Sequence, residues 1–394
     1  MPGHDLPFSM AEYERRLRIV RQEMADRGID VLFIEDPSNM NWLTGYDGWS
    51  FYVHQGVIVF HDEPPIWWGR RQDSNGAKRT VWMSDDHVHF YADNFVQSTV
   101  RHPMQDLSAI LSRKGYANKR IGVELENYYF SAKAFLTMQA ELPNAVFVDA
   151  TSLVNWMRGI KSDEEIVFMR KAARISEKIM DGIYYRADPG VRKADLVAEI
   201  YADALRGLDD AWGDYPAIVP LLPSGSSAAA PHLTWDGQVL QAGEATFFEI
   251  SGCFRRYHAP LCRTVFLGEP PKFMRDAEQA LVEGLEAGLD AARGGNTAGD
   301  IYRALSGPLE RAGIERGARA GYPIGISYPP DWGERTVSIR DEDTTVLQPG
   351  MTFHFMPGLW MDDWGMEITE SIFITESGPA ETFCSKPREL HVKK

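Results

Sequence analysis

The first 158 residues alternate short apolar runs with stretches of helical periodicity, and this alternation is the strongest constraint on the fold. Ser9 followed by Glu12 is a capping-box pattern that predicts a helix ending near Gly28, and the apolar run DVLFIE then predicts a buried strand. Further strands are predicted at HQGVIVF, RIGVEL and AVFVDA, and further helices at MQDLSAILSRKG and SAKAFLTMQAEL. Alternating strands and helices indicate an α/β domain in which helices pack on a sheet.

The pattern changes near residue 159. KSDEEIVFMRKAARISEKIMDGI is a long amphipathic segment, in which Ser162 is the expected N-cap and Glu165 completes the capping box. Three more helices are predicted at KADLVAEIYADALRG, FMRDAEQALVEGLEAGLDAAR and AGDIYRALSGPLERAG, and strands at ATFFEIS, CRTVFLG, TFHFMPG and TESIFIT. Interspersed helices and antiparallel strands predict an α+β domain. We therefore expect two domains, 1–158 and 159–394.

The bulk composition is that of a soluble protein. The chain has 394 residues, 44% of them hydrophobic, and a formal net charge of -15, which argues against a nucleic-acid surface because such a surface needs clustered positive charge. Three scattered cysteines give no disulfide framework. We find neither the apolar core of a signal peptide nor a run of about 20 apolar residues that could span a membrane. The sequence thus predicts a cytoplasmic protein with no membrane or nucleic-acid partner.

The segment FFEISGCFRRYHAPLCRT is predicted to be a β-hairpin, and Glu249 is its one acidic residue. An ionised carboxylate in such an apolar strand is costly unless it is paired or takes part in chemistry. Catalysis is one interpretation of Glu249, and a salt bridge to Arg255, Arg256 or Arg263 is the other.

Two histidines and two further glutamates are candidates for the same chemistry. His232 follows small residues and a proline, so we expect it on an extended loop, and His354 is expected on a strand with its neighbours Phe353 and Phe355 facing the other way. Either histidine, taken alone, is more often structural. Glu367 and Glu370 flank two residues of a late strand, and solvation is the alternative for both.

Aromatic residues gather in NWLTGYDGWSFY, in GLWMDDWG and at Trp67 and Trp68. Most aromatic side chains fill cores. The turn-forming residues around the first two clusters nevertheless favour a cleft, where aromatic faces suit a delocalised cation. Arg70 and Arg71 offer a guanidinium that could hold a carboxylate, although a solvated pair is the commoner case.

Several motifs together resemble the creatinase/prolidase/methionine aminopeptidase superfamily, which has the pita-bread fold. They are DPSNMNWLTGY, KSDEEIVFMRKAA, the PH pair at His232, the hairpin and the closing strands. The resemblance implies an α/β N-terminal creatinase-type domain and an α+β pita-bread catalytic domain. It also implies a homodimer in which the N-terminal domain of one subunit helps to close the other subunit's pocket, where Trp49, Tyr52 or Arg70 would act.

The metallopeptidases of this superfamily hold two metal ions with two Asp, one His and two Glu. At the matching positions this sequence has Glu249, Pro260, Tyr322, Met356 and, within a shift of one residue, Thr369 or Glu370. At least three of the five ligands are therefore missing. Hard divalent ions need several oxygen ligands at once, so we expect a metal-free pocket and no cofactor.

Within the superfamily, DPSNMNWLTGYDGWSFYVHQ and FHFMPGLW resemble the ectoine hydrolases. This resemblance implies a hydrolase acting on the carbon–nitrogen bonds of a cyclic amidine, with ectoine and also hydroxyectoine as candidate substrates, N-acetyl-2,4-diaminobutyrate as product and a deacetylase as the next enzyme. The expected catalytic residues are Glu249, His232 and His354. The expected substrate-binding residues are Trp49, Tyr52, Arg70, Tyr322, Trp360, Glu367 and Glu370.

Two other interpretations remain open. One is a metal-dependent Xaa-Pro-type dipeptidase, or another lyase of this fold, that binds one metal through Glu249, His354 and Glu370. The other is a catalytically silent binding module.

Overall fold

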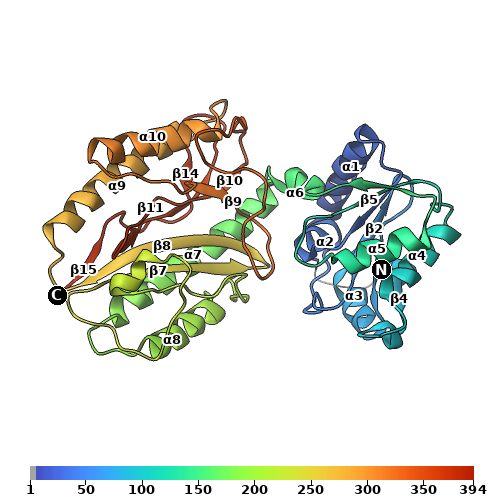
Figure 1. Ribbon diagram of the computed structural model, residues 1–394, viewed down its shortest axis with the longest axis horizontal. Coiled ribbons are helices and arrows are strands. Elements are labelled where there is room, and N and C mark those ends of the chain that lie inside the picture. The colour runs from blue at the N-terminus through green and yellow to red at the C-terminus, as the bar shows by residue number, and fades with distance from the viewer. Residues whose placement is uncertain (1–5) are drawn as a thin grey trace. The chain divides into compact units, whose positions relative to one another are not determined.

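The structure, a computed structural model, describes residues 6–394. The chain divides into two compact units, Met1–Arg158 and Gly159–Lys394 (Figure 1). Within the part of the chain that the structure describes, no helix combines the length and the apolar character needed to cross a membrane.

The first unit is an α/β domain built on a six-stranded sheet of order β4-β3-β2-β1-β5-β6. Its strands are β1 Val31–Ile34, β2 Gly56–Phe60, β3 Ile66–Arg70, β4 Val88–Tyr91, β5 Arg120–Val123 and β6 Val146–Asp149. Its α-helices are α1 Met10–Asp26, α2 Pro37–Thr44, α3 Ser74–Thr80, α4 Pro103–Arg113, α5 Ala132–Glu141 and α6 Leu153–Arg158, and short 3₁₀ turns are η1 Arg71–Asp73, η2 Asp85–His87 and η3 Asp93–Phe95. Side chains of α4 and α5 pack on one face of this sheet.

Local sequence accounts for the elements that were predicted in this unit. The Ser9 side chain accepts a hydrogen bond from the backbone N–H of Glu12, which begins α1 at the predicted cap. All four residues of β1 are buried, as expected for a strand covered on both faces. The sequence missed α2, β3, α3, β4 and α6.

The predicted aromatic cleft is wrong for Trp42 and Tyr46 of the first cluster. Trp42, Tyr46, Trp67 and Trp68 are at most 2% exposed and belong to the core of the first unit. The polar residues before Trp42 are a helix start instead of a turn, because Asp36 caps α2 by accepting hydrogen bonds from two backbone N–H groups.

The second unit is an α+β domain. Its α-helices are α7 Asp163–Arg186, α8 Lys193–Arg206, α9 Lys272–Ala291 and α10 Ala298–Arg311, with a 3₁₀ turn η4 Gly225–Ala229. Its strands are β7 Ala245–Phe254, β8 Tyr257–Leu267, β9 Gly321–Pro323, β10 Thr352–Phe355, β11 Gly358–Trp360, β12 Gly365–Glu367, β13 Glu370–Phe373, β14 Glu381–Thr382 and β15 His391–Lys393. They form three sheets of order β14-β13-β10-β9, β11-β12 and β15-β8-β7.

The predicted hairpin is present and is longer than expected, with ten residue pairs between β7 and β8. Its turn residues Arg255 and Arg256 both have positive φ, 48° and 67°. Two successive positive φ values are characteristic of a type I′ turn, whose twist matches that of a hairpin. This two-residue turn therefore connects β7 directly to β8.

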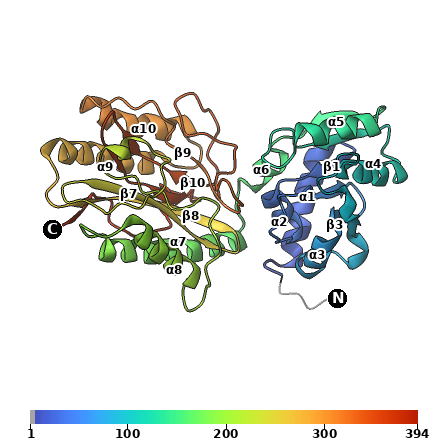
Figure 2. The same cartoon turned by 60° about the horizontal axis from the view of Figure 1, so that its bottom comes forward.

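Helices enclose the strands of this unit on two sides. Figures 1 and 2 show α9 and α10 on one side of the strands and α7 and α8 on the other. Helix α7 lies so close to the hairpin that a Cβ on Gly252 would be 2.2 Å from the carbonyl oxygen of Ala172, so glycine is required there. This packing holds the hairpin against the β9-β10-β13 strands, and the candidate site lies between these two groups of strands.

Candidate active site

Tyr322, His354 and Thr369 lie on one face of neighbouring strands. His354 is directly opposite Tyr322 on β9 and Ser371 on β13. Thr369 precedes Ser371 by two residues, and the side chains of a strand alternate between its faces, so Thr369 shares the face of His354. Phe353 and Phe355 face the hydrophobic core, as the sequence predicted.

Hydrogen bonds join these three side chains and a buried tryptophan. His354 Nε2 is 2.8 Å from Thr369 Oγ1, His354 Nδ1 is 3.1 Å from the Tyr322 hydroxyl, and Trp332 Nε1 donates to the same hydroxyl at 2.8 Å. The backbone N–H of Cys262 donates to Thr369 Oγ1. Because both hydroxyls can donate or accept, the chain of bonds is complete with either neutral tautomer of His354.

His354 is held in its neutral form. Burial, and to a smaller extent the positive charge of Arg319, lower the pKa of His354 to about 3. A histidine with so low a pKa is a poor base at neutral pH. It can pass a proton between Tyr322 and Thr369 by exchanging tautomers, without forming an imidazolium.

Glu249 faces this chain from β7, directly opposite Cys262 on β8. Its Oε1 is 3.9 Å from His354 Nδ1, and the side chain is 7% exposed. Burial, and to a smaller extent the negative charge of Asp331, raise the pKa of Glu249 to about 7. Glu249 therefore changes its protonation state close to neutral pH.

The salt bridge that was the alternative for Glu249 does not form with Arg263. The Arg263 guanidinium donates to Glu370 at 2.6 Å and to the carbonyl oxygen of Thr369 at 2.6 Å. The described neighbour of the Glu249 carboxylate is instead the neutral ring of His354, 3.9 Å away.

Glu367 and Trp360 add two buried polar groups on β12 and β11. The indole Nε1 of Trp360 has no hydrogen-bond partner among the described residues, and the side-chain partner of the Glu367 carboxyl group is the Cys262 thiol. Burial raises the pKa of Glu367 well above its ordinary value, and the charge of Glu249 adds to this effect. The site thus contains two carboxyl groups that resist simultaneous ionisation.

Glu370 lies outside this group of residues, which corrects its predicted role in binding substrate. It faces the same side of β13 as its cross-strand partner Phe355, and its carboxylate is bound by Arg263 and by Arg388 at 3.2 Å. Thr369, instead of Glu370, contacts His354. Thr369 and Glu370 were the two residues that could match the last glutamate ligand of the metallopeptidases. Of these two, Thr369 is the one that lies beside His354.

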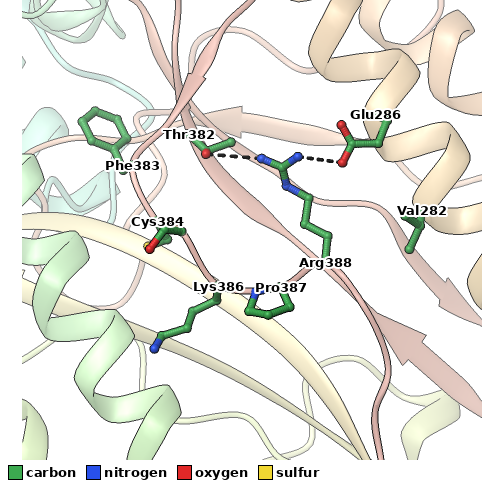
Figure 3. Close-up of a pocket in the computed structure, with 9 residues that line it drawn as sticks. Val282, Glu286, Thr382, Phe383, Cys384, Lys386, Pro387 and Arg388 are labelled. Carbon is green, nitrogen blue, oxygen red and sulfur yellow. Dashed lines mark hydrogen bonds and ion pairs between the residues drawn. The ribbon is translucent and has the colours of Figure 1, made fainter.

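A surface hollow of about 500 Å³ is lined by Arg388, by residues 382–387 and by two residues of α9 (Figure 3). Arg388 crosses it and donates to Glu286 on α9 and to Thr382. Arg388 is paired with Glu286 in the hollow, and Lys386 is paired with Asp181 on α7. The hollow therefore extends the structural network of Arg263 and Glu370.

No described contact places the remaining predicted residues beside Glu249, Tyr322 or His354. His232 is exposed on the loop after η4. Trp49 and Tyr52 are 58% and 66% exposed in the first unit. Arg70, in the same unit, is already bound to Asp73 at 2.9 Å and to the Tyr52 hydroxyl at 2.9 Å.

Sequence reasoning missed several members of the site. The predicted site residues did not include Cys262, Trp332 or Arg319. Arg319 lies three residues before Tyr322, and its guanidinium carbon is 4.6 Å from the centre of the Tyr322 ring. Proximity in sequence to Tyr322 was the one signal that could have identified it.

Known protein families match both units of the chain. The profile of metallopeptidase family M24 matches residues 167–376, and that of the Creatinase/Prolidase N-terminal domain matches residues 16–160. The chain belongs to metallopeptidase family M24. An M24 relative named ectoine hydrolase, from Halomonas elongata, is 56% identical over 98% of this chain and 99% of its own. An uncharacterized hydrolase/peptidase of Sinorhizobium fredii is 43% identical with the same coverage.

Solved structures confirm the fold of this M24 protein. A prolidase from Thermococcus sibiricus superposes with a TM-score of 0.84 at 18% identity, covering 98% of this chain and 100% of its own. An Xaa-Pro dipeptidase from Bacillus anthracis gives a TM-score of 0.81 at 18% identity, covering 97% and 100%. The predicted fold classes, an α/β creatinase-type domain and an α+β pita-bread domain, are therefore correct.

The residues present do not fit the metal pair that the name of the M24 family implies. Within residues 6–394 no three His, Cys, Asp or Glu side chains are grouped so that they could hold a metal ion. The alternative set of Glu249, His354 and Glu370 is not assembled, because Glu370 is bound to Arg263 and Arg388. We derive no step through a metal.

Proposed function

We propose that this M24 protein is a metal-independent hydrolase that opens the cyclic amidine ring of ectoine to N-acetyl-2,4-diaminobutyrate. The similarity to the Halomonas elongata ectoine hydrolase supports the substrate. One structural observation carries the proposal, namely that the buried Glu249 faces a connected chain of neutral donors at the position where a metallopeptidase would hold its metal. The dipeptidase alternative lacks a ligand set, and the silent-module alternative leaves Glu249 and Glu367 without a reason to be buried.

The proposed reaction adds one water to the amidine carbon and breaks one bond from that carbon to a ring nitrogen. The carbon becomes the carbonyl carbon of the acetyl group, and the released nitrogen becomes an amine. Because the amidinium is already positively charged, its carbon is electrophilic, and the ionised Glu249 is suited either to attack it or to take a proton from attacking water.

The leaving nitrogen needs a proton, and two groups of the site could supply it. The pKa of the Glu367 carboxyl group is raised well above its ordinary value, which favours the protonated form that can donate. Tyr322 is bonded to His354, whose exchange of tautomers can restore a proton that Tyr322 donates. His232 is the other residue that was predicted to carry a proton. Because it is exposed on its loop, we propose this role for the state in which substrate is bound.

The direct test is to incubate the purified protein with ectoine and with hydroxyectoine and to follow ring opening by NMR. We expect stoichiometric formation of an N-acetylated diaminobutyrate and no release of proline from Xaa-Pro dipeptides. Dipeptide cleavage without ring opening would contradict the proposal.

The activity should depend on pH through Glu249. Since burial raises the pKa of Glu249 to about 7, the reactive carboxylate is lost as pH falls below that value. We expect kcat/KM for ectoine to fall about tenfold per pH unit below pH 7 and to level off just above it, because kcat/KM reports the free enzyme. Steady-state rates between about pH 5 and 8 measure this, and a flat profile would exclude Glu249 as the ionising group.

Removal of metal ions should leave the activity intact. The site offers one carboxylate where divalent ions need several oxygen ligands. After dialysis against EDTA we expect unchanged kcat and, by elemental analysis, far less than one transition-metal ion per chain. Stoichiometric metal, together with activity that EDTA abolishes and Mn²⁺ or Zn²⁺ restores, would overturn metal independence.

The proposal also includes a homodimer and a deacetylase that acts on the product. The N-terminal Trp49, Tyr52 and Arg70 would then act on the pocket of the partner subunit. Light scattering during gel filtration measures the subunit number, and a monomer with full activity would exclude this arrangement.

A further inference from the structure

Arg319 lies at the edge of the candidate site. Its guanidinium carbon is 4.6 Å from the centre of the Tyr322 ring, which is a cation–π contact, and the Tyr322 hydroxyl is bonded to His354. Tyr322 is 7% exposed, whereas Arg319 is exposed. The guanidinium is therefore at the solvent side of a buried residue of the site.

The backbone that carries Arg319 is fixed by a neighbouring arginine. The Arg316 guanidinium donates to the carbonyl oxygens of Ala318 at 2.7 Å, Arg319 at 2.8 Å, Met356 at 2.9 Å and Gly358 at 3.0 Å. These bonds tie the loop before β9 to the connection between β10 and β11. Arg319 thus has a fixed backbone position beside Tyr322, while its side chain keeps its donors for another partner.

That partner is missing among residues 6–394, where no carboxylate lies within ion-pair distance of Arg319. Two other exposed arginines of the second unit do have one: Arg303 is 2.7 Å from Asp341, and Arg340 is 3.6 Å from Glu342. A guanidinium presents paired donors that match the two oxygens of a carboxylate. Arg319 therefore offers these donors at the site.

Arg319 and Glu249 have opposite effects on the pKa of Tyr322. The charge of Arg319 lowers the pKa of Tyr322, although burial dominates and raises it, and the charge of Glu249 acts in the opposite sense to Arg319. Tyr322 therefore lies close to a positive group, Arg319, and to a negative group, Glu249. Asp331 adds to the negative side, because its charge also raises the pKa of Glu249.

We propose that Arg319 forms an anion subsite that binds the carboxylate of a zwitterionic cyclic amidine while the amidinium faces Glu249. The inference rests on the proposed function and adds to it the residue that selects for the substrate's carboxylate. It also replaces Arg70 as the first candidate for this role, because the Arg70 guanidinium is already bound to Asp73.

The test compares ectoine with 2-methyl-1,4,5,6-tetrahydropyrimidine, the same cyclic amidine without the carboxylate. For Arg319→Gln we expect KM for ectoine to rise about ten- to hundredfold, as for a lost charge-assisted hydrogen-bonded pair, and kcat/KM for the analogue to stay unchanged. Arg319→Lys should recover part of the loss because it keeps the charge without the paired donors. Arg340→Gln is the matched control, an exposed arginine of the same unit, and should change neither substrate's kinetics.

The possible results separate this inference from the proposed function. If the wild-type protein processes ectoine and Arg319→Gln does so with an unchanged KM, the anion subsite is wrong and the proposed function stands. An equal loss with both substrates would also overturn the subsite, because it would indicate a general structural effect. If the wild-type protein neither binds nor opens ectoine, both the function and the subsite are wrong.

Discussion

Glu249→Gln is expected to lower kcat for ectoine by a factor of about 10² to 10⁴ if the carboxylate acts as a general base, and by more if it is the nucleophile. Glutamine fills nearly the same volume but neither accepts a proton nor attacks carbon. The backbone of β7 stays paired to β8 over ten residues, so the fold should survive. Steady-state kinetics measure the change, and turnover within tenfold of the wild type would remove Glu249 from the mechanism.

The same variant should be more stable than the wild type at alkaline pH. Because the pKa of Glu249 is raised in the folded state from 4.5 to about 7, the folded protein keeps a proton that the unfolded chain has released. The wild type should therefore lose stability as pH rises from about 4.5 to 7, by about 3 kcal/mol at 1.36 kcal/mol per pKa unit, and glutamine should abolish this loss. Urea unfolding at several pH values measures the difference.

A matched control separates this effect from a general change in charge. Glu283 on α9 is 57% exposed and paired with Arg311, so Glu283→Gln removes a carboxylate that is not buried. We expect this variant to keep the wild-type activity and the wild-type pH dependence of unfolding. Identical pH curves for the wild type and Glu249→Gln would contradict the raised pKa.

The role of Glu249 can be resolved further by intact-protein mass spectrometry after acid quenching during turnover. A nucleophile forms a covalent adduct of carboxylate and substrate, which the wild type should accumulate and Glu249→Gln should not. A general base leaves the protein mass unchanged. In either mechanism, Tyr322 and Glu367 are the groups that we propose as proton donors.

Sequence alone predicted the parts of this site that depend on local pattern. The hairpin followed from its apolar strands, α7 from the Ser162 and Glu165 capping box, and the burial of His354 from its aromatic neighbours. Glu370 could not be separated from Thr369, because a shift of one residue moves a side chain to the other face of a strand. The pairing of β13 with β10 decides the matter, and it depends on tertiary contacts.

Arg319 shows the other limit of prediction from sequence. It belongs to no periodic element, and an arginine in a Gly- and Ala-rich segment usually indicates a solvated loop. Its position beside Tyr322 depends on the bonds that Arg316 makes to Met356 and Gly358, about 40 residues later in the chain. The aromatic cluster failed for a related reason, because the core of the first unit, and not the composition of the segment, buries Trp42 and Tyr46.

Glu370→Gln is expected to destabilise the protein by about 3–5 kcal/mol, because it leaves Arg263 as a buried charge without its counter-ion. Both side chains are 0% exposed, and Arg263 Nη2 is 2.6 Å from Glu370 Oε1. Arg388 also binds Glu370, but it is 27% exposed. Arg388→Gln is the matched control and should cost less than about 1 kcal/mol, as is usual for a partly solvated pair. Urea unfolding with a constant m-value measures both.

The double variant Arg263→Met, Glu370→Leu separates the cost of an unpaired charge from the value of the pair. Removing both charges also removes the need to bury them, so we expect this variant to be clearly more stable than Glu370→Gln. Retained activity in the double variant would place Glu370 in the structure and not in substrate binding. If Glu370→Gln instead kept wild-type stability and raised KM for ectoine, the original prediction would be right, and the ion pair would not explain why this carboxylate is buried. Thr369 and Glu370 are adjacent in the chain, yet His354 binds one and Arg263 the other, so substitution of each should affect a different property.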